Sequence, residues 1–111
     1  MYTRFFDRLV VATGTDAFSA HTPVTGAGAN AARSEVILIS HVSLTGLTAT
    51  MQGSNDLQNW RDLSTTGSLT AIGKTSFANT AITDAYLRMK ISITGTNAVG
   101  IVMADGNVSQ Q

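Results

Sequence analysis

The side chains that could do chemistry are few, and they are densest in one stretch. Residues 53–63 read GSNDLQNWRDL and hold the only tryptophan of the chain. Four side chains there offer oxygen atoms of the kind that Ca²⁺ binds: Asn55, Asp56, Asn59 and Asp62. Their spacing lacks the terminal glutamate of an EF-hand loop. Because Asn and Asp readily hydrogen-bond to nearby backbone, we interpret them as turn-stabilising residues and predict no metal site.

Catalytic residues are equally sparse. His21 and His41 are the only histidines, and no spaced cluster of carboxylates accompanies them. Ser40 or Ser43 could be paired with His41 and an aspartate, but the chain has no G-x-S-x-G nucleophile elbow. The absence of cysteine excludes a thiolate nucleophile and a cysteine metal site. The sequence therefore predicts a protein that is not an enzyme and needs no cofactor.

Trp60 has two interpretations. If it is exposed, it could stack against a sugar ring, with Tyr86 as a second aromatic contact. A single tryptophan in a small β-domain more often fills the core, because it buries so much area. The sequence favours the core for Trp60 and leaves the sugar contact as an alternative.

Short strands separated by turns are expected to position this stretch. Residues 35–44 are β-branched and apolar on both faces, which predicts a central strand. Residues 47–52 alternate apolar and polar side chains and form the next strand. Gly53, Ser54, Asn55 and Asp56 tolerate positive φ and are expected to reverse the chain; Asn59 supports the turn, and Trp60 and Leu63 begin the returning strand.

The remaining chain predicts further strands. Residues 85–94 alternate most clearly, with Leu87, Met89, Ile91 and Ile93 on one face. Other strands are expected at 4–12, 69–72, 75–78 and 98–104, followed by a polar tail at 105–111. Residues 13–32 are rich in Gly, Ala, Thr and Ser, and predict a long loop or flexible arm with an edge strand near Pro23.

These patterns predict an all-β fold. Seven to nine short strands with regular turns indicate a single antiparallel β-sandwich or jelly-roll-like domain spanning residues 1–111. The chain has seven basic and seven acidic residues, and its charged share of 13% is about half the usual value of about 25%. A neutral surface with no basic run argues against nucleic-acid binding and is poorly protected against self-association.

A family resemblance gives the functional expectation. The run LTGLTATMQGSND at 44–56, then Asn59-Trp60 and Leu63, resembles small β-sandwich proteins of tailed bacteriophages and prophages. In that pattern a later strand is similar to AYLRMKISITG at 85–95, and the resemblance spans roughly residues 34–104. Leu57 departs from it, as does the arm at 13–32. The GSND and NW corner also resembles the corners of discoidin-like and other carbohydrate-binding sandwiches.

The resemblance implies a virion structural protein, such as a head decoration or a minor capsid or tail component. Its expected partners are copies of itself and other particle proteins, and its expected location is the virion, assembled in the bacterial host cytoplasm. No stretch approaches the roughly 20 apolar residues of a membrane span, and residues 1–8 do not form a signal peptide. We therefore expect neither a membrane nor Sec export. The alternative is a carbohydrate-binding module that uses Trp60 and Tyr86.

Overall fold

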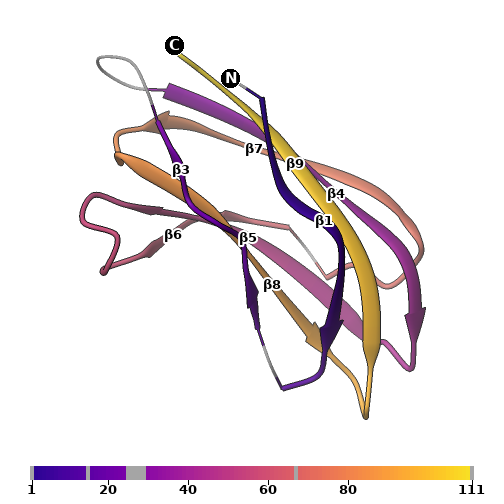
Figure 1. Ribbon diagram of the computed structural model, residues 1–111. Coiled ribbons are helices and arrows are strands. Elements are labelled where there is room, and N and C mark those ends of the chain that lie inside the picture. The colour runs from indigo at the N-terminus through magenta and orange to yellow at the C-terminus, as the bar shows by residue number, and fades with distance from the viewer. Residues whose placement is uncertain (1, 15, 25–29, 67, 111) are drawn as a thin grey trace.

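Two antiparallel sheets pack face to face (Figure 1). The computed structural model describes residues 2–14, 16–24, 30–66 and 68–110. The first sheet has the order β1 (Tyr2–Ala12), β9 (Val99–Gln110), β4 (Asn30–Val42), β7 (Gly73–Ile82). The second has the order β2 (Ala17–Phe18), β8 (Tyr86–Thr94), β5 (Gly46–Ser54), β6 (Arg61–Thr65), and β3 (Thr22–Pro23) also pairs with β8. The prediction of an all-β fold with packed antiparallel sheets is confirmed.

The core lies between the two sheets and follows the predicted alternation. On β5 the buried apolar side chains alternate along the strand, and on β8 the four predicted positions are all buried. The fully buried large side chains include Val36, Leu38, Leu47, Met51, Ile82, Leu87, Met89, Ile91 and Val102. Each such side chain contributes roughly 1.5–3 kcal/mol relative to an exposed one. Apolar burial therefore holds the sheets together.

The strand β4 is central, as predicted, because it lies between β9 and β7. Its faces, however, do not alternate without interruption. A register shift between Leu38 and Ser40 marks a bulge in the pairing with β9. A bulge adds one residue and moves the following side chains to the opposite face. Val36 and Leu38 are buried in the core, whereas Val42 is 65% exposed.

The predicted arm at 13–32 is corrected by the structure. Both β2 and β3 pair with β8, and β4 already begins at Asn30. The expected edge strand near Pro23 is present as β3. Ser19 ties the segment down, because its Oγ accepts a hydrogen bond from the Met89 backbone N–H at 2.8 Å. Residues 25–29, the middle of the predicted arm, lie outside the described residues. Small side chains concealed this pairing, since it is made mostly by backbone groups.

Two other boundaries differ from the prediction. The expected polar tail at 105–111 is instead the end of β9, which pairs with β4 up to Gln110; Gln111 lies outside the described residues. The expected strand at 69–72 is absent, and Leu69 forms only an isolated bridge to Leu47. β7 instead begins at Gly73. In both cases backbone pairing with β4 decides the extent of the strand, and it does so independently of hydropathy.

Candidate functional site

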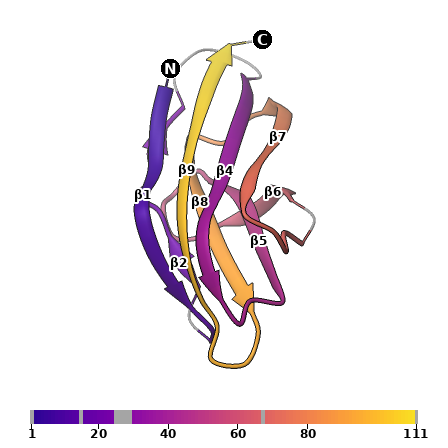
Figure 2. The same cartoon turned by 90° about the vertical axis from the view of Figure 1, so that its right-hand side faces the viewer.

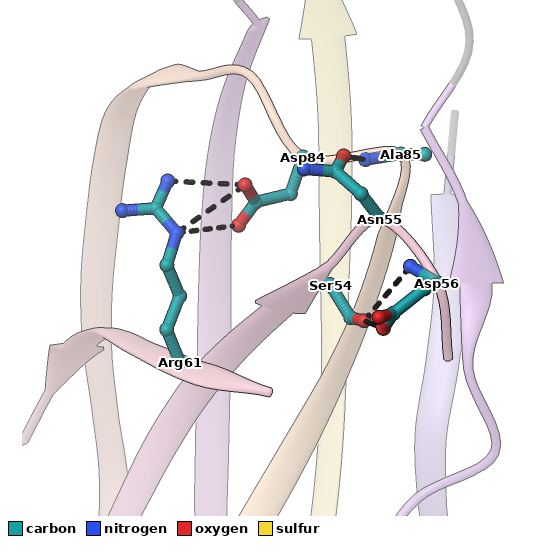
Figure 3. A network of polar contacts seen from close by, with 6 residues as sticks. All are labelled: Ser54, Asn55, Asp56, Arg61, Asp84 and Ala85. Carbon is teal, nitrogen blue, oxygen red and sulfur yellow. Dashed lines mark hydrogen bonds and ion pairs between the residues drawn. The ribbon is translucent and has the colours of Figure 1, made fainter. Parts of the chain in front are cut away.

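The candidate site is a corner of the second sheet, where the 55–60 turn between β5 and β6 meets the 83–85 loop between β7 and β8 (Figure 3). A hollow of about 190 Å³ opens there, and we call it the corner hollow. It is lined by Gly53, Ser54, Asn55, Asn59, Trp60, Arg61 and Asp84. Six of these seven residues belong to the stretch 53–63 singled out from the sequence; the sequence assigns no role to Arg61, or to Asp84 outside the stretch.

The turn itself is organised around one carboxylate. Asp56 Oδ1 accepts hydrogen bonds from the backbone N–H groups of Gln58 (2.9 Å) and Asn59 (2.8 Å). The Asn59 side chain donates to Oδ2 at 2.8 Å. The Asn59 and Gln58 backbone donors, followed by the Asn59 side chain, hold the pKa of Asp56 far below its usual value. This is the turn-stabilising role predicted for Asp56 and Asn59.

Ser54 completes the turn (Figure 3). Its Oγ accepts from the backbone N–H groups of Asp56 (3.2 Å) and Leu57 (3.0 Å), and its hydroxyl donates to Asp56 Oδ1 at 3.0 Å. The serine and carboxylate therefore form a hydrogen-bonded pair. Both groups are thereby engaged with the backbone of the turn as well as with each other.

The chain reverses at a residue that the sequence did not indicate. Leu57 has a φ of 64°, whereas none of the residues 53–56 has a positive φ. The prediction that Gly53 to Asp56 supply the left-handed conformation is therefore wrong. The left-handed region costs a non-glycine residue roughly 1–2 kcal/mol. The hydrogen bonds to Ser54 and Asp56 hold the backbone in place despite this cost.

Gly53 is needed for space. It lies in β5, where a Cβ atom would come 2.8 Å from Asp84 Cγ and still closer to Asp84 Oδ2. Asp84 is only 5% exposed and receives three close contacts from Arg61, from Nε at 3.3 and 3.1 Å and from Nη2 at 3.0 Å. The fork-shaped guanidinium matches the carboxylate, which makes this the strongest ion pair of the corner (Figure 3).

A further bond joins the turn to the same loop. Asn55 Oδ1 accepts a hydrogen bond from the Ala85 backbone N–H at 2.9 Å. Asn55 and Arg61 thus hold the 83–85 loop from the two ends of the 55–60 turn (Figure 3). Sequence reasoning missed the role of this loop, because the residues involved are far apart in the chain and no motif surrounds Asp84.

Trp60 lies outside the core, and the prediction that it fills the core is wrong. It is half-buried and does not belong to the buried apolar cluster. The guanidinium of Arg88 lies 4.2 Å from the centre of its ring, and the same guanidinium lies 4.4 Å from the ring of Phe18. Arg88 is therefore placed between two aromatic rings on the outer surface of β8. Burial lowers the pKa of Arg88.

The neighbouring side chains extend this surface. Arg88 Nε donates to Gln52 Oε1 at 2.8 Å, and Gln52 Nε2 donates to Asp62 Oδ1 at 2.8 Å. Tyr86 lies on the same face of β8 as Arg88, and its ring meets His21 edge-on at 5.5 Å between centres. Trp60 and Tyr86, the two proposed sugar contacts, thus lie along one polar and aromatic surface. Leu63 packs against the core from β6.

The two histidines lie apart in the described part of the chain. His21 contacts Tyr86, whereas His41 lies at the far end of β4, so the two histidines do not meet. Among the described residues no three His, Asp or Glu side chains form a group able to hold a metal ion. No helix in the described ranges is long and apolar enough to cross a membrane.

Comparison with known proteins gives a likeness of fold. No family model matches the sequence, and no curated protein sequence matches it. A solved structure with a similar fold is that of the PBSX exported protein XepA, with a TM-score of 0.73 and 11% sequence identity. The alignment covers 100% of this chain and 37% of XepA, so this chain spans little more than a third of that protein. At this identity the likeness shows the fold alone.

Proposed function

We propose that this chain is a non-enzymatic structural component of a phage-type particle, a head decoration or a minor capsid or tail protein. It acts by associating with itself and with other particle proteins. The observation that carries the proposal is the likeness of fold, over the whole chain, to a protein of the phage PBSX. The resemblance of residues 44–63 to small sandwich proteins of tailed phages points to the same class.

The side-chain chemistry supports binding over turnover. The carboxylates of the corner are engaged in turn and loop contacts: Asp56 with backbone N–H groups and Asp84 with Arg61. No histidine lines the corner hollow. The neutral chain and its low charged share favour close contact with other proteins, since little charge repels a partner.

The test is the composition of the particle. Particles purified by density gradient from a host that carries this gene should contain the protein at a constant ratio to the major capsid protein, measured by mass spectrometry. A deletion strain complemented with a tagged copy should return the tag to the particle fraction. A protein found only in the soluble fraction or the medium, and never with particles, would contradict the proposal.

A second candidate function is carbohydrate binding at the corner hollow. The observation that favours it is the position of Trp60, which is half-buried at the edge of a hollow lined by amides and an ion pair. Its volume of about 190 Å³ is below the roughly 300–1,000 Å³ of enclosed ligand pockets, so it suits a single sugar ring. Tyr86 lies farther along the same surface.

Glycan-array binding separates the two candidates. The carbohydrate reading predicts a signal for the wild type that Trp60→Ala abolishes, while circular dichroism shows an intact fold. Tyr86→Phe, which keeps the ring and removes the hydroxyl, should weaken binding only where that hydroxyl contacts the sugar. The same signal in wild type and Trp60→Ala would exclude this site, and a wild type without any signal would leave the particle protein as the single candidate.

A further inference from the structure

The outer surface of the first sheet is unusually apolar. An antiparallel sheet that faces water on one side normally presents polar side chains there. Here Val10 is 63% and Val42 65% exposed. We call the following outward-pointing side chains the apolar face: Val10, Ile37, Val42, Val99, Ile101 and Met103.

The apolar face is continuous across three adjacent strands. Val10 on β1 is opposite Ile101 on β9, and on the other side of β9 the pairs are Val99 with Val42 and Met103 with Ile37. Directly opposed side chains have Cβ atoms roughly 4.5–5.5 Å apart, so these residues touch one another. Figure 2 shows β1, β9, β4 and β7 side by side in one sheet.

A row of charges crosses the strands at one end of the apolar face. Arg4 on β1, Asp105 on β9 and Glu35 on β4 are in register. Lys74 on β7 lies 3.6 Å from Glu35. The row thus holds two positive and two negative side chains. Because the signs are balanced, this border does not favour a partner with strong charge of one sign, and it leaves the apolar side chains as the binding surface.

We propose that the apolar face binds a second copy of this chain, in an isologous contact related by a two-fold axis. This deepens the proposed function, on which it rests, by naming the self-association surface. The chain has zero net charge, so two copies approach without repulsion. A two-fold contact requires a patch that can pack against its own copy, and the uncharged side chains of the apolar face meet this requirement.

The size of the sheet fits this partner. Four strands spaced by about 4.8 Å give a width of about 19 Å, and ten residues at about 3.4 Å each give a length of about 34 Å. The outer surface of the sheet is therefore roughly 650 Å², close to the roughly 800 Å² that each partner contributes to a standard protein interface. One sheet against its copy is enough for a specific dimer.

The test places like charges on the face. The double variant Val10→Lys and Val42→Lys puts four lysines between two facing copies and should convert the dimer into a monomer. Leu57→Lys is the matched control, because Leu57 is also an exposed large apolar residue but lies in the 55–60 turn of the other sheet. Light scattering after size exclusion at roughly 100 µM detects any dimer with a Kd in the micromolar range. Far-UV circular dichroism and Tm establish that each variant is folded.

A charge-exchange experiment makes the test independent of one variant. Val10→Asp with Val42→Asp should also be monomeric, and mixing it with the lysine double variant should restore a dimer, because opposite charges then face each other. A wild-type oligomer that persists in both double variants, or a mixture that stays monomeric, would overturn the inference. A wild-type monomer would overturn it too, while the particle proposal would still be decided separately by mass spectrometry of purified particles.

Discussion

Gly53 offers the sharpest test of how the corner is built. Replacing it with alanine places a Cβ atom 2.8 Å from Asp84 Cγ, within the space now filled by a nearly buried carboxylate. The carboxylate must move, and movement breaks its alignment with Arg61. We therefore expect Gly53→Ala to destabilise the protein. Strand geometry alone predicts that it stabilises the protein, because alanine normally stabilises an extended segment relative to glycine.

The expected loss follows from two contributions. Overpacking in a filled space costs about 2 kcal/mol. The displaced Arg61–Asp84 pair adds about 1 kcal/mol. This is the upper end of the range for surface ion pairs, and it applies because the Arg61 side chain is 61% exposed. The sum of about 3 kcal/mol corresponds to a fall in Tm of roughly 12 °C for a chain of this size.

Urea unfolding followed by tryptophan fluorescence measures the change, since Trp60 lies beside the corner. Gly100→Ala is the matched control: its Cβ would lie 3.7 Å from Leu38 Cδ1, an ordinary contact, so its effect should stay within about 1 kcal/mol. In an Asp84→Gly background the cost of Gly53→Ala should fall to about 0.5 kcal/mol or less, as a coupled pair requires. A Gly53→Ala protein as stable as the wild type would refute the steric argument.

Three further predictions concern single contacts. The pKa of Asp56 is lowered on folding from the ordinary 3.8, so the contribution of Asp56 to stability is present above that value and is lost as the pH falls below it. Asp56→Asn should therefore be less stable than the wild type at neutral pH, and in urea titrations it should lose less stability on acidification. An equal loss in the two proteins would contradict this. Ser19→Ala leaves the buried Met89 N–H without its partner and should cost about 1–2 kcal/mol in thermal unfolding, whereas Ser92→Ala on the solvent face of β8 should change little. A double-mutant cycle of Trp60→Leu and Arg88→Met should give a coupling of about 0.5–1 kcal/mol, and simple additivity would show that the stacking contributes nothing.

The sequence predicts those parts of the fold that depend on residues close together in the chain, such as the alternation of side chains along one strand. On β5 and β8 every second side chain is apolar and faces the core, so the pattern gives both the element and the core-facing side, although Thr50 and Gln52 on the other face of β5 are buried as well. Asp56 and Asn59 were also predictable, because an Asx turn bonds residues two or three positions apart. In these cases the partners that decide the structure lie within a few residues of each other.

The parts that were missed depend on partners distant in the chain. The bulge after Leu38 reflects the register with β9, and the pairing of β2 with β8 is made largely by backbone groups. Trp60 was expected in the core because of its size, but the space between the sheets is already filled by aliphatic side chains of β4, β5, β8 and β9. The tryptophan instead lies against Arg88, whose long side chain shields one face of the ring from water.

The difference between near and distant partners also explains why the sequence points to the corner but assigns the wrong role to Gly53. Gly53 was expected to supply conformational freedom, and Leu57 adopts the left-handed conformation instead. What Gly53 supplies is the absence of a side chain opposite Asp84. Asp84 has no motif around it, and it lies in the loop that connects β7 in one sheet to β8 in the other. The contacts of Asp84 with Arg61 and of Ala85 with Asn55 fasten the loop that connects the two sheets to the edge of the second sheet.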